Sequence, residues 1–261
     1  MSRGGFSRWA AAVLAAVLAI PGALALPPAP DAPAANPTSS PTVDEIVKRY
    51  LAARGGLKKL EALQTLRQEG RVHAGAGRDG LVAREIKRPG KIRFELTVQG
   101  VTSIYASDGQ RGWKVAPFEG DLKARPLPDE ALIDAREQAD IDGPLVDWKK
   151  KGSRIELVGR EAVDGRDAWK LKLTLKSGGV LTAYVDVESA NLVKTDATRR
   201  VRGRDVRVET TFGDFRKTGG ILFPHRVEVR AAGRPQVMKI VVDKVEVNPP
   251  ISDARFVPPA L

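Results

Sequence analysis

The residue types that most often carry catalysis are few in this chain. His73 and His225 are the only histidines, and no second histidine stands near either of them. Neither is therefore a good candidate for a metal ligand or a general base. Cysteine is absent, which excludes a thiolate nucleophile, a thiolate metal site, a disulfide framework and a cysteine-borne lipid anchor.

Serines and carboxylates do not complete an active site either. Ser103, Ser107 and Ser153 lie outside any Gly-x-Ser-x-Gly turn of the kind that exposes a nucleophile. Four carboxylates occur near the middle of the chain: Asp134, Asp140, Asp142 and Asp147. Their spacing forms no consistent helical face, so we expect a solvated acidic surface. Because the sequence also has no phosphate-binding glycine loop, we predict no catalytic residue, no metal and no cofactor.

Apolar side chains at strand spacing are the more informative feature. Between Lys91 and Val98 every second residue is apolar, after a turn at Pro89-Gly90. This alternation predicts a strand with one dry and one wet face. Residues 169–176 repeat the pattern, with lysines on most of the wet positions. A sheet with such a dry face needs another part of the chain to cover it.

Turn residues divide most of the chain into short strands. The predicted strands are 68–74, 81–87, 91–99, 101–107, 110–115, 155–161, 166–175, 181–187, 191–201, 205–215, 221–229 and 236–247. The connections between them are short and rich in Gly and Asp-Gly. Such connections join neighbouring antiparallel strands, so an antiparallel sheet is expected.

Helical patterns occur in two places. Thr42 and Glu45 form a capping box for a first helix, and a second helical piece is expected over 57–66. The segment 126–148 predicts a third helix that ends before a Gly-Pro pair. We therefore expect a mainly β fold with a few helices (α+β). It is an open, curled antiparallel half-barrel of about 11–12 strands, with the helical segments as its plug or lid.

The N-terminal residues predict export. Residues 1–25 contain two arginines, an apolar run and a small-x-small cleavage site, as in a cleavable signal peptide. An uncleaved anchor helix is the alternative. Residues 26–41 are rich in Pro and Ala and predict a semi-extended linker. Residues 42–261 are then expected to form a single domain that is soluble in the periplasm after signal cleavage.

The chain is strongly basic, with a net charge of +11. In an exported protein this charge favours anionic partners such as lipid head groups, and it allows peripheral contact with an anionic membrane surface. Nucleic acid is not an expected partner, because the predicted export and the lack of zinc-finger or RNA-binding motifs argue against it. A solvated basic surface that binds nothing is the plain alternative.

Several short motifs resemble one family. They are Arg88-Pro89 before the alternating strand, Asp108-Gly109 followed by Trp113, Gly213-Asp214-Phe215-Arg216, Phe223-Pro224-His225, Val247-Asn248-Pro249-Pro250-Ile251, and Phe256 before Pro258-Pro259. Over residues 43–259 the chain resembles the LolA-like periplasmic lipoprotein carriers and their relatives, the outer-membrane lipoprotein-sorting proteins. The resemblance implies an incomplete barrel with a helical lid over a hydrophobic cavity that holds acyl chains.

The same resemblance implies a set of site residues. Arg88 matches the arginine that tethers the closed lid, and its five donors could bridge orphan carbonyls at the ends of the crossing helix. An edge arginine that satisfies a local turn is the alternative. The candidate cavity-lining residues are Ile92, Phe94, Leu96, Ile104, Trp113, Leu132, Ile133, Leu145, Trp169, Leu171, Leu173, Tyr184, Phe212 and Phe223. For each of these, ordinary core packing is the alternative.

The resemblance also implies a function. It predicts a monomeric periplasmic carrier that binds the acyl chains of a lipoprotein or lipid and moves it towards the outer membrane. Such a carrier has an inner-membrane donor and an outer-membrane acceptor. Two alternatives remain open: an envelope sensor or structural protein of the same fold, and an envelope enzyme.

Overall fold

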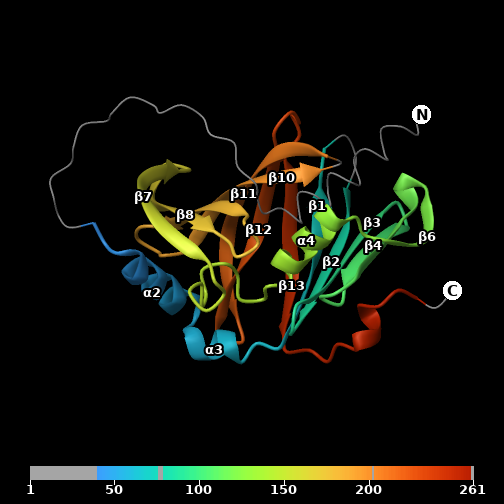
Figure 1. Cartoon of the computed structure of the whole chain (residues 1–261), viewed down its shortest axis with the longest axis horizontal. Helices are drawn as coiled ribbons and strands as arrows, with labels where there is room; N and C mark the ends of the chain where they lie inside the picture. The colour runs from blue at the N-terminus through green and yellow to red at the C-terminus, as the bar shows by residue number, and fades with distance from the viewer. Residues whose placement is uncertain (1–39, 76–78, 202, 260–261) are drawn as a thin grey trace.

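One antiparallel sheet of thirteen strands curls around the interior of the described part of the chain (Figure 1). The computed structural model describes residues 40–75, 79–201 and 203–259. The predicted signal peptide and nearly all of the predicted linker lie outside the described residues. The strands are β1 (Thr65–His73), β2 (Asp79–Lys87), β3 (Lys91–Val98), β4 (Val101–Ser107), β5 (Gly112–Ala116), β6 (Asp121–Pro126), β7 (Arg154–Val163), β8 (Arg166–Thr174), β9 (Val180–Asp186), β10 (Leu192–Val201), β11 (Arg204–Thr218), β12 (Ile221–Ala231) and β13 (Met238–Val247). The α-helices are α2 (Val43–Arg54), α3 (Leu57–Glu61) and α4 (Asp129–Gln138).

The strand order explains why the sheet stays open. It runs β6-β5-β4-β3-β2-β1-β13-β12-β11-β10-β9-β8-β7, so two meanders meet where β1 pairs with β13. The outermost strands, β6 and β7, do not pair with each other. Residues 127–153, which we call the crossing segment, connect these two edges and carry α4 over the sheet, against β3, β4 and β10 (Figure 1). The open, curled half-barrel predicted from the sequence is confirmed.

Each predicted strand overlaps an observed strand, and β6 is the strand that the sequence did not predict. Its residues Asp121–Pro126 alternate between polar and apolar types, but their burial does not follow this alternation, and Leu122 is 76% exposed. The strand forms because its backbone pairs with β5 at the edge of the sheet. The segment is short, has only Leu122 and Ala124 as aliphatic residues and ends in Pro126, so its pattern was too weak to predict a strand.

The N-terminal helices form largely as predicted. Thr42 Oγ1 accepts a hydrogen bond from Glu45 N at 3.3 Å, and the Glu45 carboxylate accepts one from Thr42 N at 2.7 Å, which completes the capping box. Gly55 ends α2 with a φ of 115°, and a Cβ there would lie 2.2 Å from the Gly220 carbonyl oxygen. The second helical piece is shorter than expected, because α3 ends at Glu61 and β1 begins at Thr65.

The apolar core lies on the inner face of the sheet, beneath the crossing segment. Trp169, Leu171 and Leu173 of β8 pair with apolar residues of β9, and each is at most 4% exposed. Leu145 and Val146 of the crossing segment are also buried in this core. The β7–β9 end of the sheet is therefore filled by its own side chains.

Truncation of a core residue should show how firmly this end is packed. We expect Leu171→Ala to lower the free energy of unfolding by about 2–5 kcal/mol, because it removes buried methyl groups that the surroundings cannot replace. The matched control is Val158→Ala on β7, where the side chain is 56% exposed and the expected loss is below about 1 kcal/mol. Urea unfolding of the two variants measures both values, and equal losses would contradict the placement of Leu171 in a packed core.

Candidate functional site: a cavity beneath a helical lid

Two neighbouring cavities lie between the sheet and the crossing segment. Their volumes are about 210 and 230 Å³, and Gln68, Arg84, Phe212 and Pro224 line both. The larger one is otherwise lined mainly by apolar side chains of the strands: Val82, Phe94, Leu181, Val227, Val229, Ile240 and Val242. Gln138 of the lid helix α4 lines it from the other side. Each cavity exceeds an engineered apolar cavity of about 150 Å³ that accepts benzene, so a hydrocarbon chain has space here.

The predicted lining residues divide into groups. Three of them line the cavities: Phe94, Phe212 and Phe223. Five are buried core residues that line neither of the two cavities: Ile92, Leu96, Trp169, Leu171 and Leu173. In the crossing segment, Leu145 is fully buried, Leu132 lies over Gly112 of β5, and Ile133 is 48% exposed to solvent. Six of the fourteen predicted residues, these five and Leu145, are therefore ordinary core.

Ile104 and Trp113 were predicted to line the cavity but lie on the opposite face of the sheet. Directly paired residues of neighbouring strands share a face. Ile104 pairs with Glu95, whose side chain points away from that of Phe94. Trp113 lies on the same outer side, where its Nε1 donates a hydrogen bond to the Phe256 carbonyl at 2.9 Å. The C-terminal segment, and not the cavity, explains its burial.

Tyr184 is also on the outer face. It pairs with Lys170 and Lys194, and both ammonium groups lie within 6 Å of its ring centre, at 5.7 and 4.9 Å. Its hydroxyl donates to Asp196 at 3.0 Å. The aromatic side chain of Tyr184 suggested an apolar lining residue. The strand register instead places it on the outer face, beside charged side chains.

The lid helix α4 is held to the sheet mainly by polar bonds. The buried residues of the helix are Asp134, Ala135 and Gln138, so its inward face carries a carboxylate, a methyl group and an amide. Arg199 of β10 donates from Nη1 to Asp134 at 2.7 Å and to Glu137 at 3.3 Å. The Arg199 side chain is fully buried. One end of the attachment is therefore an ion pair that is shielded from water.

Further arginines attach the lid at other points. Arg136 of α4 donates from Nε and Nη2 to the carbonyls of Gly109 and Gln110, at 3.1 and 2.9 Å, in the turn between β4 and β5. Arg84 of β2 donates from Nη2 to the carbonyl of Gln138, at the end of the helix, at 2.8 Å. The lid is thus tied to both halves of the sheet.

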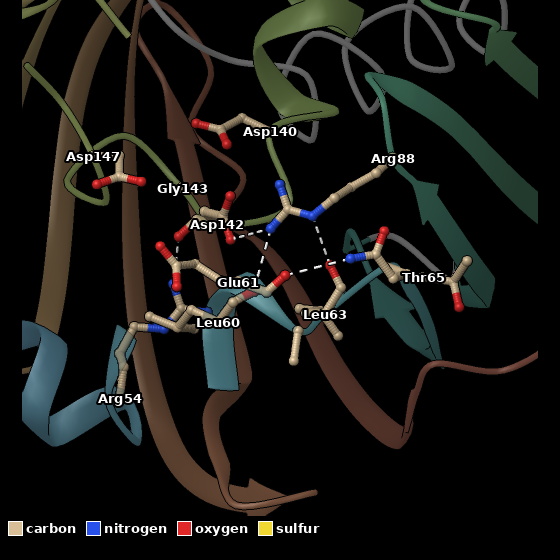
Figure 2. Close-up of polar contacts among 12 residues, drawn as sticks. Arg54, Leu60, Glu61, Leu63, Thr65, Arg88, Asp140, Asp142, Gly143 and Asp147 are labelled. Carbon is tan, nitrogen blue, oxygen red and sulfur yellow. Dashed lines mark hydrogen bonds and ion pairs between the residues drawn. The ribbon is translucent and has the colours of Figure 1, made fainter. Parts of the chain in front are cut away.

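Arg88 connects the crossing segment to the N-terminal helices (Figure 2). Its Nε donates to the Leu63 carbonyl at 2.7 Å, and its Nη2 donates to the Leu60 carbonyl at 3.2 Å and to the Asp142 carboxylate at 2.6 Å. The Asp142 carbonyl also accepts a hydrogen bond from Arg54 of α2 at 2.7 Å. The carbonyls that Arg88 binds belong to α3 and the residues after it. They do not belong to the crossing helix, where the sequence placed them.

The prediction of a solvated acidic surface is wrong. Asp134 and Asp142 are 8% and 7% exposed, and both pair with arginines of distant elements. Asp140 accepts hydrogen bonds from Lys151 at 2.6 and 2.8 Å, and Asp147 pairs with a neighbouring lysine. Helical spacing compares residues of one helix only, so it could not show partners that other strands supply.

Burial changes the protonation of the lid carboxylates. The pKa of Asp134 is raised to about 7, mainly by burial and also by the nearby carboxylates Glu137 and Glu130, against the lowering effect of Arg199. Burial also raises the pKa of Glu137 and Asp140. Asp134 therefore binds a proton close to neutral pH. Protonation replaces the ion pair with Arg199 by a hydrogen bond to a neutral acid, and it removes the cost of burying the carboxylate charge.

The two histidines each lie beside one polar partner. Buried His225 lies with Nδ1 2.7 Å from the Val242 carbonyl oxygen, and His73 lies 3.2 Å from Asp79 at the end of the first hairpin. Within residues 40–75, 79–201 and 203–259, no group of three His, Asp or Glu side chains is placed to hold a metal ion. In the same ranges, no helix is long and apolar enough to cross a membrane.

No family model matches this sequence, and no curated protein is significantly similar to it. Solved structures do share its architecture. A LolA superfamily protein from Nitrosomonas europaea superposes with a TM-score of 0.53 at 14% identity, over 84% of this chain and 98% of that one. The chain has the LolA-like fold. The fold resemblance inferred from the short motifs is therefore confirmed.

Two further structures agree with this assignment. A DUF1329 family protein from Desulfovibrio piger gives a TM-score of 0.54 at 15% identity, over 82% of this chain and 97% of that one. A putative outer membrane lipoprotein-sorting protein domain from Vibrio parahaemolyticus gives 0.53 at 10% identity, over 82% and 97%. At these identities the likeness concerns the fold, and the site must be argued from this chain's own residues.

The raised pKa of Asp134 predicts a pH dependence of stability. Its folded pKa of about 7 lies above the ordinary value of 3.8, so the folded state binds more protons than the unfolded state between these values. The contribution of Asp134 to the free energy of unfolding therefore rises as the pH falls through neutrality. We expect Asp134→Asn to flatten the pH dependence between about pH 8 and pH 5, by at most about 1.4 kcal/mol per pH unit.

Urea unfolding of the wild type and the variant at several pH values tests this expectation. The control is Asp44→Asn on α2, which removes a carboxylate that is 67% exposed and pairs with Lys149, away from Asp134. Parallel curves for the wild type and Asp134→Asn would contradict the raised pKa.

Proposed function

We propose that this chain is a periplasmic carrier that binds the acyl chains of a lipoprotein or lipid in the cavity and moves it towards the outer membrane. The observation that carries the proposal is the unfilled, mainly apolar space between the curled sheet and the lid. A sheet that filled its own interior would leave no room for a guest. The carrier takes its cargo from an inner-membrane donor, delivers it to an outer-membrane acceptor, acts as a monomer and catalyses no reaction.

The energetics of hydrocarbon transfer support a carrier of this kind. Each methylene that leaves water contributes about 0.8 kcal/mol. The two cavities together lie near the lower end of the about 300–1,000 Å³ that ligand pockets occupy. The closed form therefore accommodates a single chain, and a larger cargo requires the lid to move.

The attachment of the lid suits repeated capture and release. When the lid opens, Asp134, Gln138 and the Arg88–Asp142 ion pair become exposed, and water can solvate all of them. It exposes few large apolar side chains of α4, because the buried residues of the helix are polar or small. The free energy cost of opening is therefore moderate, whereas an apolar seal would resist water strongly.

A cavity-filling variant tests the site. Thr210 of β11 lines the larger cavity, and its neighbour Thr211 faces outwards, paired with Lys194 and Glu228. We expect Thr210→Phe to weaken the binding of a fluorescent fatty acid about tenfold or more, since the ring occupies the space of the guest. Thr211→Phe is the matched control and should bind as the wild type does. Equal affinities of the two variants would contradict the proposed cavity.

Removal of the Arg88 latch tests the role of the lid. Arg88→Leu removes hydrogen bonds to a charged group, which are worth about 1.5–3 kcal/mol. We expect a fluorescent lipid to pass from this variant to acceptor vesicles roughly ten- to a hundredfold faster than from the wild type.

The control for the latch is Lys149→Gln. It removes an exposed ion pair of 2.8 Å between the crossing segment and Asp44 of α2, and such pairs contribute little. Unchanged transfer by Arg88→Leu would show that Arg88 is only an edge arginine. Lipid that binds but never passes to vesicles would favour an envelope sensor over a carrier.

A further inference from the structure

Arg84, a charged residue on the apolar face of the sheet, lines both cavities. Arg84 lies between Val82 and Ile86 on β2, so its side chain shares the inner face of the sheet with theirs. It pairs with Phe94 on one side and Gln68 on the other, and both of these line a cavity. The sequence contains a signal for Arg84, because an arginine stands at an apolar position of an alternating strand. The predicted lining residues did not include it.

The guanidinium of Arg84 is incompletely bonded. Its Nη2 donates to the Gln138 carbonyl at 2.8 Å, while its Nε is buried and has no hydrogen-bond partner. Within the described ranges, no carboxylate lies within 4 Å of it, whereas Arg88 has one such partner and Arg199 has two. The crossing segment therefore supplies carboxylate partners to Arg88 and Arg199 and leaves the charge of Arg84 unpaired.

A second polar side chain in the same cavity is also without partners. The Gln138 side chain lines the larger cavity in a residue that is 9% exposed, and neither its Nε2 nor its Oε1 has a hydrogen-bond partner. Native proteins rarely leave buried donors unsatisfied, because each costs about 1–3 kcal/mol. Two unsatisfied donors in one cavity indicate a ligand with acceptor oxygens.

The charge of the cavity fits an anion. Burial lowers the pKa of Arg84 to about 10, so the guanidinium stays protonated at neutral pH. The other charged residues around the cavities have partners: Glu69 pairs with Arg67 at 2.6 Å, Asp140 pairs with Lys151 at 2.6 Å, and Arg54 donates to the Asp142 carbonyl at 2.7 Å and to the Tyr50 hydroxyl at 3.1 Å. A buried unpaired charge is unfavourable, and an oxyanion beside it would remove most of that cost.

We propose that Arg84 and Gln138 bind the anionic head group, a carboxylate or a phosphate, of a single-chain amphiphile whose hydrocarbon lies along the apolar strands. This inference rests on the proposed function, because it names the class of guest that the closed cavity takes. A guanidinium presents paired donors that match a carboxylate or phosphate, and the apolar lining of Val227, Val229 and Ile240 suits the chain. The head group is then held inside the protein, under the lid.

Three ligands with the same chain test this proposal: hexadecanoate, hexadecyl phosphate and hexadecanol. Each is titrated into the full-length protein at neutral pH by displacement of a neutral fluorescent probe. We expect the wild type to bind at least one of the two anions about tenfold or more tightly than the alcohol. The anion that binds more tightly distinguishes a fatty-acid guest from a phosphate-bearing lipid.

Variants show whether Arg84 is responsible. Arg84→Met should bind hexadecanol but lose the preference for the anions. Gln138→Leu keeps the backbone carbonyl that Arg84 binds, and should reduce the preference by a smaller factor. Arg136→Gln removes two lid bonds outside these cavities and should keep the preference, whatever its effect on overall affinity.

The outcomes separate this inference from the proposed function. Equal binding of acid, phosphate and alcohol by the wild type, or an unchanged preference in both Arg84→Met and Gln138→Leu, overturns the head-group site and leaves the lipid carrier standing. If Arg136→Gln also lost the preference for the anions over the alcohol, the position of the lid and not Arg84 would explain that preference. This result would also overturn the head-group site. Failure of the wild type to bind any of the three ligands overturns the carrier itself.

Discussion

The hydrogen bonds and ion pairs between arginines of the sheet and the crossing segment are the interactions on which the rest of the structure depends. The lid helix offers the sheet carboxylates, an amide and alanines, so hydrophobic packing alone cannot hold it. Arg199, Arg84 and Arg88 supply the attachment from three places on the sheet or its edge. Each arginine side chain extends from the sheet or its edge to a polar group of the crossing segment. These bonds hold the helix at a distance from the inner face. The cavity is the space that this arrangement leaves.

The topology of the sheet makes such a space unavoidable. The two meanders meet at β1 and β13 and end at edges that do not pair, so the curled sheet has a concave face without a second sheet to fill it. The β7–β9 end is filled by its own large side chains, whereas residues such as Thr195 and Thr210 near the centre are too small to do so. One connection of residues 127–153 must then cover the opening. A short helix and a loop can cover the opening without filling the space beneath it.

The sequence predicted the sheet well because alternation is a local property. Period-two patterns located twelve of the strands, and a capping box located α2. The site was harder to predict, because it depends on register and on distant partners. Alternation separates two faces but does not say which one lies under the lid, which is why Ile104 and Tyr184 were assigned to the wrong face. The carboxylates of the crossing segment looked solvated, because their arginine partners lie on other elements and only the fold brings them together.

The central claim is that a hydrocarbon chain occupies the space between the sheet and the lid. Crystallisation with hexadecanoate that carries bromine at its terminal carbon tests this claim most directly, because anomalous scattering locates the end of the chain. We expect bromine density inside the cavity that Phe212 and Val229 line. Bromine found only on the outer surface, with the cavity closed by repacked side chains, would contradict it.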